Sequence, residues 1–461
     1  MSSRRAITSS KQVLARVTSL PGIVLFALAL RLVVVTCVFR AVAAPTANHS
    51  EFGWEMGWTA RSIVLGHGFS SPFLPFTGPT ALVPPIYPYL IAGVEKLFGL
   101  YSAQSAFVIL SLNSLLSALT CIPIYLATAE SVNRRVASFA AWGWAIYPFA
   151  IYFSATRVWE FSLTSLLVAT CFWLALRLHA HPRLVGWLGF GLLFGLSVLS
   201  NPAVLSLFPV LVILPVWKMY RAGGRWLRTG CFLGVGMLVA LTPWTLRNYR
   251  VMHVICPVRD CFWYEFWSAN NGDGSNPTLA WTHPASNPAE MSLYKAQGEI
   301  AYIAQKRAIA GDFVSSHYGF FAGLTLRRIV CYWTGFWSLD PEYMREEPTQ
   351  LPNVLMCTCL TGLLLFGACA WWRRDRTGSL PYLLTVGLFP VTYYITHPLM
   401  DYRHAIEPEI VILVVLGLRE VKWRLRSHSE DTSDIHLLDA LASYGDARTS
   451  AAGAESSASA N

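Results

Sequence analysis

The hydrophobic pattern of this chain consists of long apolar runs separated by short polar segments. A helix needs about 20 consecutive apolar residues to cross a hydrocarbon core about 30 Å thick. Runs close to that length begin at residue 21 and recur as far as residue 418. The pattern therefore predicts about ten transmembrane helices, at residues 21–44, 104–128, 137–156, 159–177, 184–200, 202–217, 229–244, 351–372, 380–398 and 406–418.

Two of the connecting segments are too long to be simple turns: residues 45–103 and residues 245–350. In the first, residues 86–98 have the pattern of a short amphipathic helix at the membrane interface. In the second, residues 317–337 place Arg327 and Arg328 among aromatic side chains, which favours another interfacial helix over a span. Residues 427–461 are rich in Ser, Ala and Asp and are predicted to be disordered.

The composition agrees with a membrane protein. Hydrophobic residues make up 54% of the chain and charged residues 13%, whereas globular domains contain about 25% charged residues. This excludes an array of soluble domains, and the high hydrophobicity excludes a disordered chain. We predict an all-α polytopic membrane protein, in which a cytoplasmic segment (1–20) precedes a transmembrane domain (21–420).

The net charge of +9 is concentrated in alternate connections. Cytoplasmic loops are enriched in Lys and Arg, so this alternation predicts that both termini are cytoplasmic and that both long segments lie outside. No basic domain of the nucleic-acid-binding kind is present, so we expect no nucleic-acid partner. The basic clusters are Arg134/Arg135, Arg177/Arg183, Lys218 to Arg228, Arg373 to Arg376 and Arg419 to Arg426.

The first outside segment contains two candidate catalytic acids, Glu51 and Glu55. They are four residues apart and share one face if the segment is helical. Because they lie among tryptophans near the bilayer, we expect one of them to have a raised pKa and to act as a general base. The alternative is a pair of solvated acids in an exposed loop.

Charged residues also gather at the outer ends of the predicted spans. Arg157 and Glu160 flank the third and fourth spans, where they either pair with each other or belong to a site. Arg247, Arg250 and Arg259 follow the seventh span. Guanidinium groups suit phosphate oxygens, so these arginines either bind a phosphate or anchor the segment to lipid headgroups.

The turn between the last two spans carries His397, Asp401, Tyr402, Arg403 and His404. This composition favours a phosphate-binding cluster, with a simple polar turn as the alternative. Metal binding by His397, Asp401 and His404 is conceivable, but their spacing matches no strong metal signature. We therefore assign no metal ligand and no certain cofactor, and we leave a divalent metal open.

Most of the ten cysteines lie inside apolar runs, where free Cys behaves as a small hydrophobic residue. Cys256 and Cys261 lie in the second outside segment, where an oxidising compartment would permit a disulfide. The spacing alone does not decide whether they pair.

Several short motifs occur in a characteristic order along the chain, beginning with the acidic first segment. Together they resemble the bacterial GT-C glycosyltransferases related to protein O-mannosyltransferases and lipid A aminoarabinose transferases, over about residues 20–420. The remaining motifs are Gly66-His67-Gly68-Phe69, Pro84-Pro85-Ile86-Tyr87-Pro88, Lys96-Leu97-Phe98-Gly99, Pro243-Trp244-Thr245-Leu246-Arg247-Asn248-Tyr249, Asp401-Tyr402-Arg403-His404 and Glu407-Pro408.

The resemblance implies an inverting enzyme of the bacterial inner membrane, with its active site facing the periplasm. Such an enzyme takes a sugar from a polyprenyl-phosphate donor and passes it to a lipid, glycan or protein acceptor. An acidic residue of the first outside segment acts as the base. That role falls on Glu55 or Glu51, and Glu55 lies closer to the expected helix that runs to Arg61.

For the donor phosphate we select Arg247, Arg250, Arg403 and His404, because all four are predicted at the outer interface, where a lipid phosphate would lie. A transporter or flippase of a lipid-linked glycan is the alternative function, and a cell-wall assembly scaffold without turnover is another. A transporter would place its ionisable residues near the bilayer midplane, whereas here they gather at one face.

Overall fold

A computed structural model describes residues 19–42, 48–271, 282–335 and 350–425. These residues form helices joined by turns; within the described ranges, the pairing of Ser70 with Pro79 is an isolated bridge and no strand is present. The helices are α2 (Leu20–Val42), η1 (Ser50–Phe52), α3 (Glu55–Val64), α4 (Ile86–Phe98), α5 (Ala103–Leu119), α6 (Cys121–Ser131), α7 (Arg134–Ala145), α8 (Pro148–Thr156), α9 (Phe161–Ala180), α10 (Leu184–Ser200), η2 (Pro202–Leu207), η3 (Pro209–Ile213), α11 (Leu214–Arg221), α12 (Trp226–Met252), α13 (Phe262–Ala269), α14 (Pro288–Gln297), α15 (Glu299–Ser316), α16 (Tyr318–Thr334), α18 (Gln350–Arg374), α19 (Arg376–Leu388), α20 (Val391–Ile395) and η4 (Met400–Ile406), followed by a helix at residues 407–425.

The structure confirms an all-α, multi-pass membrane fold. Among the described residues, five helical segments are long and apolar enough to cross a bilayer, and the pair α7 and α8, bent by 43°, makes a sixth. Other predicted spans are helical but shorter or interrupted: residues 202–217 are divided among η2, η3 and α11, and residues 380–398 between α19 and α20. The total of ten spans therefore stays a prediction.

Both predicted interfacial segments are helical. Residues 86–98 coincide with α4, and residues 317–337 contain α16. The prediction that the seventh span ends at residue 244 was wrong, because α12 continues to Met252. It ends where His253 adopts a left-handed backbone conformation (φ 58°). The second long segment therefore begins about two turns later than predicted, and Arg247 and Arg250 lie on a helix. The predicted cytoplasmic segment 1–20 and the tail 427–461 fall almost entirely outside the described residues.

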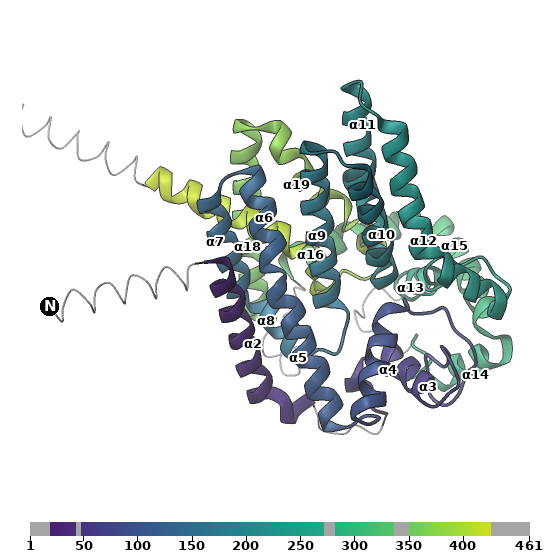
Figure 1. Ribbon diagram of the computed structural model, residues 1–461. Coiled ribbons are helices and arrows are strands. Elements are labelled where there is room, and N and C mark those ends of the chain that lie inside the picture. Colours follow the sequence, from purple (N-terminus) through teal and green to yellow (C-terminus); the bar gives the residue numbers. More distant parts are fainter. Residues whose placement is uncertain (1–18, 43–47, 272–281, 336–349, 426–461) are drawn as a thin grey trace, which may run out of the picture.

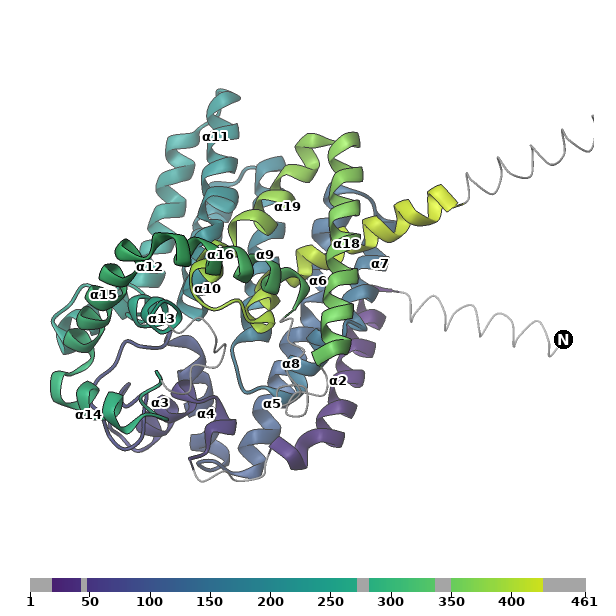
Figure 2. The same ribbon diagram turned by 180° about the vertical axis from the view of Figure 1, so that it is seen from behind.

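The two ends of the helix bundle differ in character. Helices α3, α4, α13, α14 and α15 gather at one end, whereas the α11–α12 and α18–α19 turns lie at the other (Figures 1 and 2). These two turns carry the basic clusters from Lys218 to Arg228 and from Arg373 to Arg376. The arrangement agrees with the expected placement of basic loops on one side and long segments on the other.

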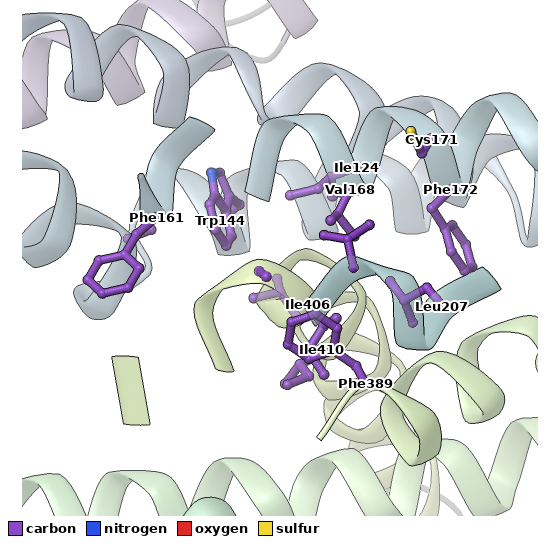
Figure 3. Close-up of a cluster of buried hydrophobic side chains, with 14 of the residues drawn as sticks. Ile124, Trp144, Phe161, Val168, Cys171, Phe172, Leu207, Phe389, Ile406 and Ile410 are labelled. Carbon is purple, nitrogen blue, oxygen red and sulfur yellow. The ribbon is translucent and has the colours of Figure 1, made fainter. Parts of the chain in front are cut away.

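Two hydrophobic cores hold the molecule together. The larger fills the bundle, where side chains of α6, α7 and α9 pack against η4 and residues 407–425 (Figure 3). The smaller joins the two long segments and contains Trp58, Phe73 and Leu82 from the first and Tyr264 and Trp267 from the second. The long segments therefore fold together as one unit on the end of the bundle.

Glycines allow α10 and α12 to approach each other closely. A Cβ atom at Gly191 would lie 2.0 Å from the carbonyl oxygen of Leu233, and one at Gly236 would lie 2.2 Å from that of Leu188. Small residues at such crossings let the two backbones meet directly, which is a common way of packing helices in membranes.

We predict that Gly191→Ala destabilises the protein by about 1–3 kcal/mol, because the added methyl group must push the two helices apart. The matched control is Gly189→Ala on the same helix, where a Cβ atom meets nothing within 4 Å. Thermal unfolding in detergent micelles measures both variants. Equal transition midpoints for the two would contradict this description of the α10–α12 contact.

Candidate active site

The first long segment is tied to α12 by Arg247. The guanidinium donates hydrogen bonds to the carbonyl oxygens of Thr80, at 2.7 Å, and Phe69. It also lies over the rings of Phe69 and Trp244, with its carbon 5.3 and 5.0 Å from the ring centroids. Arg247 therefore holds residues 69–80 in place, and these contacts occupy much of its donor capacity.

The same segment is tied to α15 by Glu299, which is buried at the start of that helix. Its carboxylate accepts hydrogen bonds from the Thr80 hydroxyl (2.5 Å), the Ala81 N–H (2.7 Å) and the Tyr294 hydroxyl (2.8 Å). Burial raises the pKa of Glu299 to about 7, against the opposing effect of these hydrogen bonds. The N–H of Asp260 also donates to the Ala81 carbonyl (2.9 Å).

These attachments place α3 against the turn that precedes α14. Glu55 is the first residue of α3, and its Oε1 lies 2.5 Å from Nε2 of His283. The other ring nitrogen of His283 accepts a hydrogen bond from the N–H of Ala285 (3.1 Å). An imidazole nitrogen that accepts carries no proton, so this pattern assigns the proton to Nε2 and makes His283 the donor to Glu55.

The electrostatic surroundings favour an ionised Glu55. Burial works against the charged form, but the hydrogen bond from His283 and the charge of Arg259 leave the pKa of Glu55 below its ordinary value. The raised pKa expected from the sequence is therefore wrong for Glu55. The second carboxylate oxygen of Glu55 has no partner in another described residue. The carboxylate thus keeps one oxygen available for a substrate proton.

Arg259 lies among acids without pairing directly with any of them. Although burial opposes its charge, the neighbouring Cys261, Glu265, Tyr393 and Glu160 raise the pKa of Arg259. Within the described ranges, no residue accepts a hydrogen bond from its guanidinium or lies within ion-pair distance. A partly buried cation with all its donors available is the expected partner of an anion from outside the chain.

Two further carboxylates surround Arg259. Glu160, buried at the start of α9, accepts a hydrogen bond from Asn201 (3.3 Å), while its Oε2 has no partner. Burial raises the pKa of Glu160 to about 7. Glu265 in α13 lies 3.4 Å from Nε2 of His397. The end of the bundle therefore brings together three glutamates, two histidines and one unpaired guanidinium, from segments far apart in sequence.

The other predicted residues occupy different positions. Glu51 lies in η1, which Gly53 and Trp54 separate from α3, and its Oε1 is 3.7 Å from Nδ1 of His49. Arg250 is exposed near the end of α12. Arg157 is exposed at the end of α8; burial raises the pKa of Asp401, and the charge of Arg157 opposes that shift.

Tyr402 stacks on Tyr393, with ring centroids 4.9 Å apart, and the charge of Arg259 reaches both phenols. Of the predicted residues, Glu55, Glu160 and Tyr402 thus lie around Arg259, and Asp401 is adjacent in sequence to Tyr402.

Arg403 and His404 lie inside the bundle rather than at its surface. The guanidinium of Arg403 is 3.3 Å from Oε1 of Glu407, and Nδ1 of His404 is 2.5 Å from Oε2 of the same carboxylate. Tyr147 also donates a hydrogen bond to Glu407 (3.0 Å). The three side chains of this group, Arg403, His404 and Glu407, are at most 1% exposed.

From the sequence, His283 is not a candidate, and Arg259 is one of three arginines that either bind a phosphate or anchor the segment but is not among the four selected for the donor phosphate. His283 follows Thr282 in a loop without a motif, and only its pairing with Glu55, 228 residues away, distinguishes it. Arg259 lies between Cys256 and Cys261, which drew attention as a possible disulfide; both cysteines are free thiols. In the part of the chain that the structure describes, no group of three or more His, Cys, Asp or Glu side chains is placed to hold a metal ion.

Comparison with solved structures gives similarities to an archaeal oligosaccharyltransferase from Archaeoglobus fulgidus. The apo form has 15% identity and a TM-score of 0.49, covering 89% of this chain and 52% of that one. The complex with an inhibitory peptide and a dolichol-phosphate has 13% identity and a TM-score of 0.49, covering 87% and 51%. The complex with Zn and sulfate has 15% identity and a TM-score of 0.44, covering 86% and 49%. This chain thus spans about half the length of those proteins.

No curated protein matches this sequence significantly. A family model does match, over residues 82–245: that of the dolichyl-phosphate-mannose-protein mannosyltransferases. The matched segment runs from the end of the first long segment to α12 and includes Glu160, whereas Glu55, Arg259 and His283 lie outside it. The resemblance to GT-C glycosyltransferases is therefore confirmed over residues 82–245, where this chain matches the dolichyl-phosphate-mannose-protein mannosyltransferase family.

Proposed function

We propose that this protein is a glycosyltransferase that moves a sugar from a polyprenyl-phosphate donor to a hydroxyl or amine of an acceptor, with Glu55 as general base. The observation that carries the proposal is the juxtaposition of a hydrogen-bonded, ionised Glu55 with the unpaired guanidinium of Arg259. The family match over residues 82–245 supports the same reaction class.

The residues suit the proton and charge movements of this reaction. Glu55 takes the proton from the acceptor as the acceptor atom attacks the anomeric carbon of the sugar. The bond between that carbon and the phosphate oxygen breaks, and the phosphate leaves with the bonding electrons. Attack from the side opposite the phosphate inverts the anomeric centre. Negative charge grows on the leaving phosphate, where a fixed cation stabilises it most.

We assign the phosphate-binding role first to Arg259. The four residues selected from the sequence have other positions: Arg247 bonds to backbone carbonyls, Arg250 is exposed, and Arg403 and His404 share Glu407 inside the bundle. A buried and paired guanidinium is costly to pull away from its carboxylate. Arg403 and His404 therefore act as positioning residues that support the turn carrying Asp401 and Tyr402.

The charge pattern indicates on which side of the membrane the site lies. Basic turns at the end opposite α3 and α14 favour a cytoplasmic position for that end and for both termini, with the site facing the periplasm of a bacterial inner membrane. A lipid-linked donor fits this side, since its phosphate lies at the interface where Arg259 is placed. The acceptor remains open among lipid, glycan and protein.

We predict that Glu55→Gln lowers transfer by about 10²–10⁴-fold, the usual contribution of a general base. Transfer of radiolabelled sugar from polyprenyl-phosphate donors in purified membranes measures it. Glu51→Gln is the matched control, because Glu51 lies outside the Glu55–His283 pair, and it should retain activity. Loss in Glu51→Gln with retention in Glu55→Gln would move the base to Glu51, and lipid-linked sugar changing leaflet without consumption would indicate a transporter.

His283 should control the pH at which the base works. Since its hydrogen bond helps to hold the pKa of Glu55 below the ordinary value against the effect of burial, His283→Ala should raise that pKa. The acidic limb of the kcat/KM profile then moves to higher pH, and activity is lost earlier as the pH falls. His49→Ala is the control and should leave the limb unchanged. An unmoved limb in His283→Ala would show that the pair does not set the ionisation of the base.

Arg259→Ala should raise the KM for the polyprenyl-phosphate sugar about 10–100-fold, the effect expected from losing hydrogen bonds to a charged group. Arg250→Ala, which removes an exposed arginine of α12, should change it much less. Donor titration in nanodiscs compares the two. A larger effect at Arg250 would transfer the phosphate role to the end of α12.

A further inference from the structure

Trp54, the residue before the candidate base, is unusually exposed for its size and position. Its side chain is 40% exposed, whereas its neighbours Phe52, Met56 and Trp58 are at most 3% exposed. Its indole ring lies edge-on to His283, with centroids 6.0 Å apart, and edge-on to Trp58, at 5.8 Å. The ring is therefore held beside the Glu55–His283 pair, while much of its surface faces outward.

The backbone at Trp54 is strained. Its φ of 51° and ψ of −126° lie in a region that a bulky side chain rarely adopts. Such conformations are unfavourable and cluster at functional sites. The preceding residue must be a glycine, because Gly53 has a φ of 103° and a Cβ atom there would lie 2.6 Å from the Val158 carbonyl oxygen.

Hydrogen bonds on both sides keep the chain in this conformation. The N–H of Trp54 donates to the Ser50 carbonyl (3.0 Å), and its own carbonyl accepts from the N–H of Trp58 (2.9 Å). The indole N–H of Trp54, in contrast, donates to no described residue, whereas that of Trp58 donates to the Asn48 carbonyl (2.7 Å). Trp54 thus presents both an apolar face and a free donor.

Other exposed tryptophans in the described ranges are at the opposite, basic end of the bundle. Trp217 in α11 and Trp372 in α18 each lie beneath a guanidinium, of Arg221 and Arg376 respectively. Tryptophan next to basic side chains at a membrane boundary is typical of interfacial anchoring. Trp54 lies beside an acid and a histidine instead, so its setting differs from that of an anchor.

An exposed aromatic face with a free N–H suits a sugar ring, which presents an apolar C–H face and polar hydroxyls at its edge. In the proposed reaction the acceptor atom lies between Glu55 and the anomeric carbon of the donor sugar, so a group beside Glu55 lies closer to the acceptor than to the donor sugar or its phosphate. We propose that Trp54 is a stacking platform for a sugar ring of the acceptor, which makes the acceptor a carbohydrate-bearing molecule. This inference rests on the proposed function for the direction of transfer.

The binding step is testable without turnover. The full chain in nanodiscs, labelled with 5-fluorotryptophan, is titrated with methyl glycosides of glucose, mannose, galactose and N-acetylglucosamine and, separately, with an N-acetylated, serine-containing tripeptide. The Trp54 signal is the ¹⁹F resonance missing from Trp54→Phe. We expect a saturable shift of this signal with at least one glycoside and none at the Trp217 signal. A shift with the tripeptide alone, or no shift with any glycoside, would overturn the proposal.

Kinetics provide the second readout. With an acceptor that supports transfer, Trp54→Ala should raise the acceptor KM about tenfold, the scale of an aromatic stacking contact, and leave the donor KM unchanged. Trp54→Phe should restore much of the loss, and Trp217→Ala is the control. If Trp54→Ala still transfers sugar and its acceptor KM is unchanged, this inference is wrong and the proposed function is unaffected. If no transfer occurs but the glycoside titration succeeds, the proposed function fails and the sugar site stands.

Discussion

The candidate site depends on two ionisable side chains, the partly buried Arg247 and the buried Glu299, which attach the first long segment to the rest of the molecule. Arg247 reaches from α12 to the carbonyls of Phe69 and Thr80, and Glu299 reaches from α15 to the other side of the same segment at Thr80 and Ala81. Both bonds join residues more than 150 positions apart in sequence. Because buried backbone groups must find partners, these contacts fix the position of residues 69–81. They thereby also fix the position of α3, which precedes this segment in the chain.

Charges inside the bundle are handled in a similar way. Arg31, fully buried in α2, donates to Ser117 and to the carbonyls of Ala27, Trp144 and Ala145. Glu407 balances Arg403 and accepts from His404 and Tyr147. These groups are satisfied within the chain, as buried charges have to be. Arg259 differs from them, because its guanidinium has no hydrogen-bond or ion-pair partner among the described residues, and this is the basis for proposing it as a ligand-binding charge.

The sequence predicted the features that depend on local pattern. Apolar length predicted the helical segments and amphipathicity predicted α4. Glu55 was one of two candidate acids, preferred over Glu51 because it lies closer to the expected helix that runs to Arg61. Features that arise only when distant segments meet could not be predicted. Nothing near Thr282 indicates that His283 will face Glu55. The polar turn containing Arg403 looked like an outer surface, although its charged side chains turn inward to Glu407.

The separation of Glu55 and His283 along the chain also determines when the pair can form during biosynthesis. The two residues are separated by 228 positions, with α4 to α13 between them. Helices α4 to α13 are therefore synthesised before His283, and during that time Glu55 lacks its hydrogen-bond donor. Under the proposed function, the base therefore acquires its hydrogen-bond donor only late in synthesis.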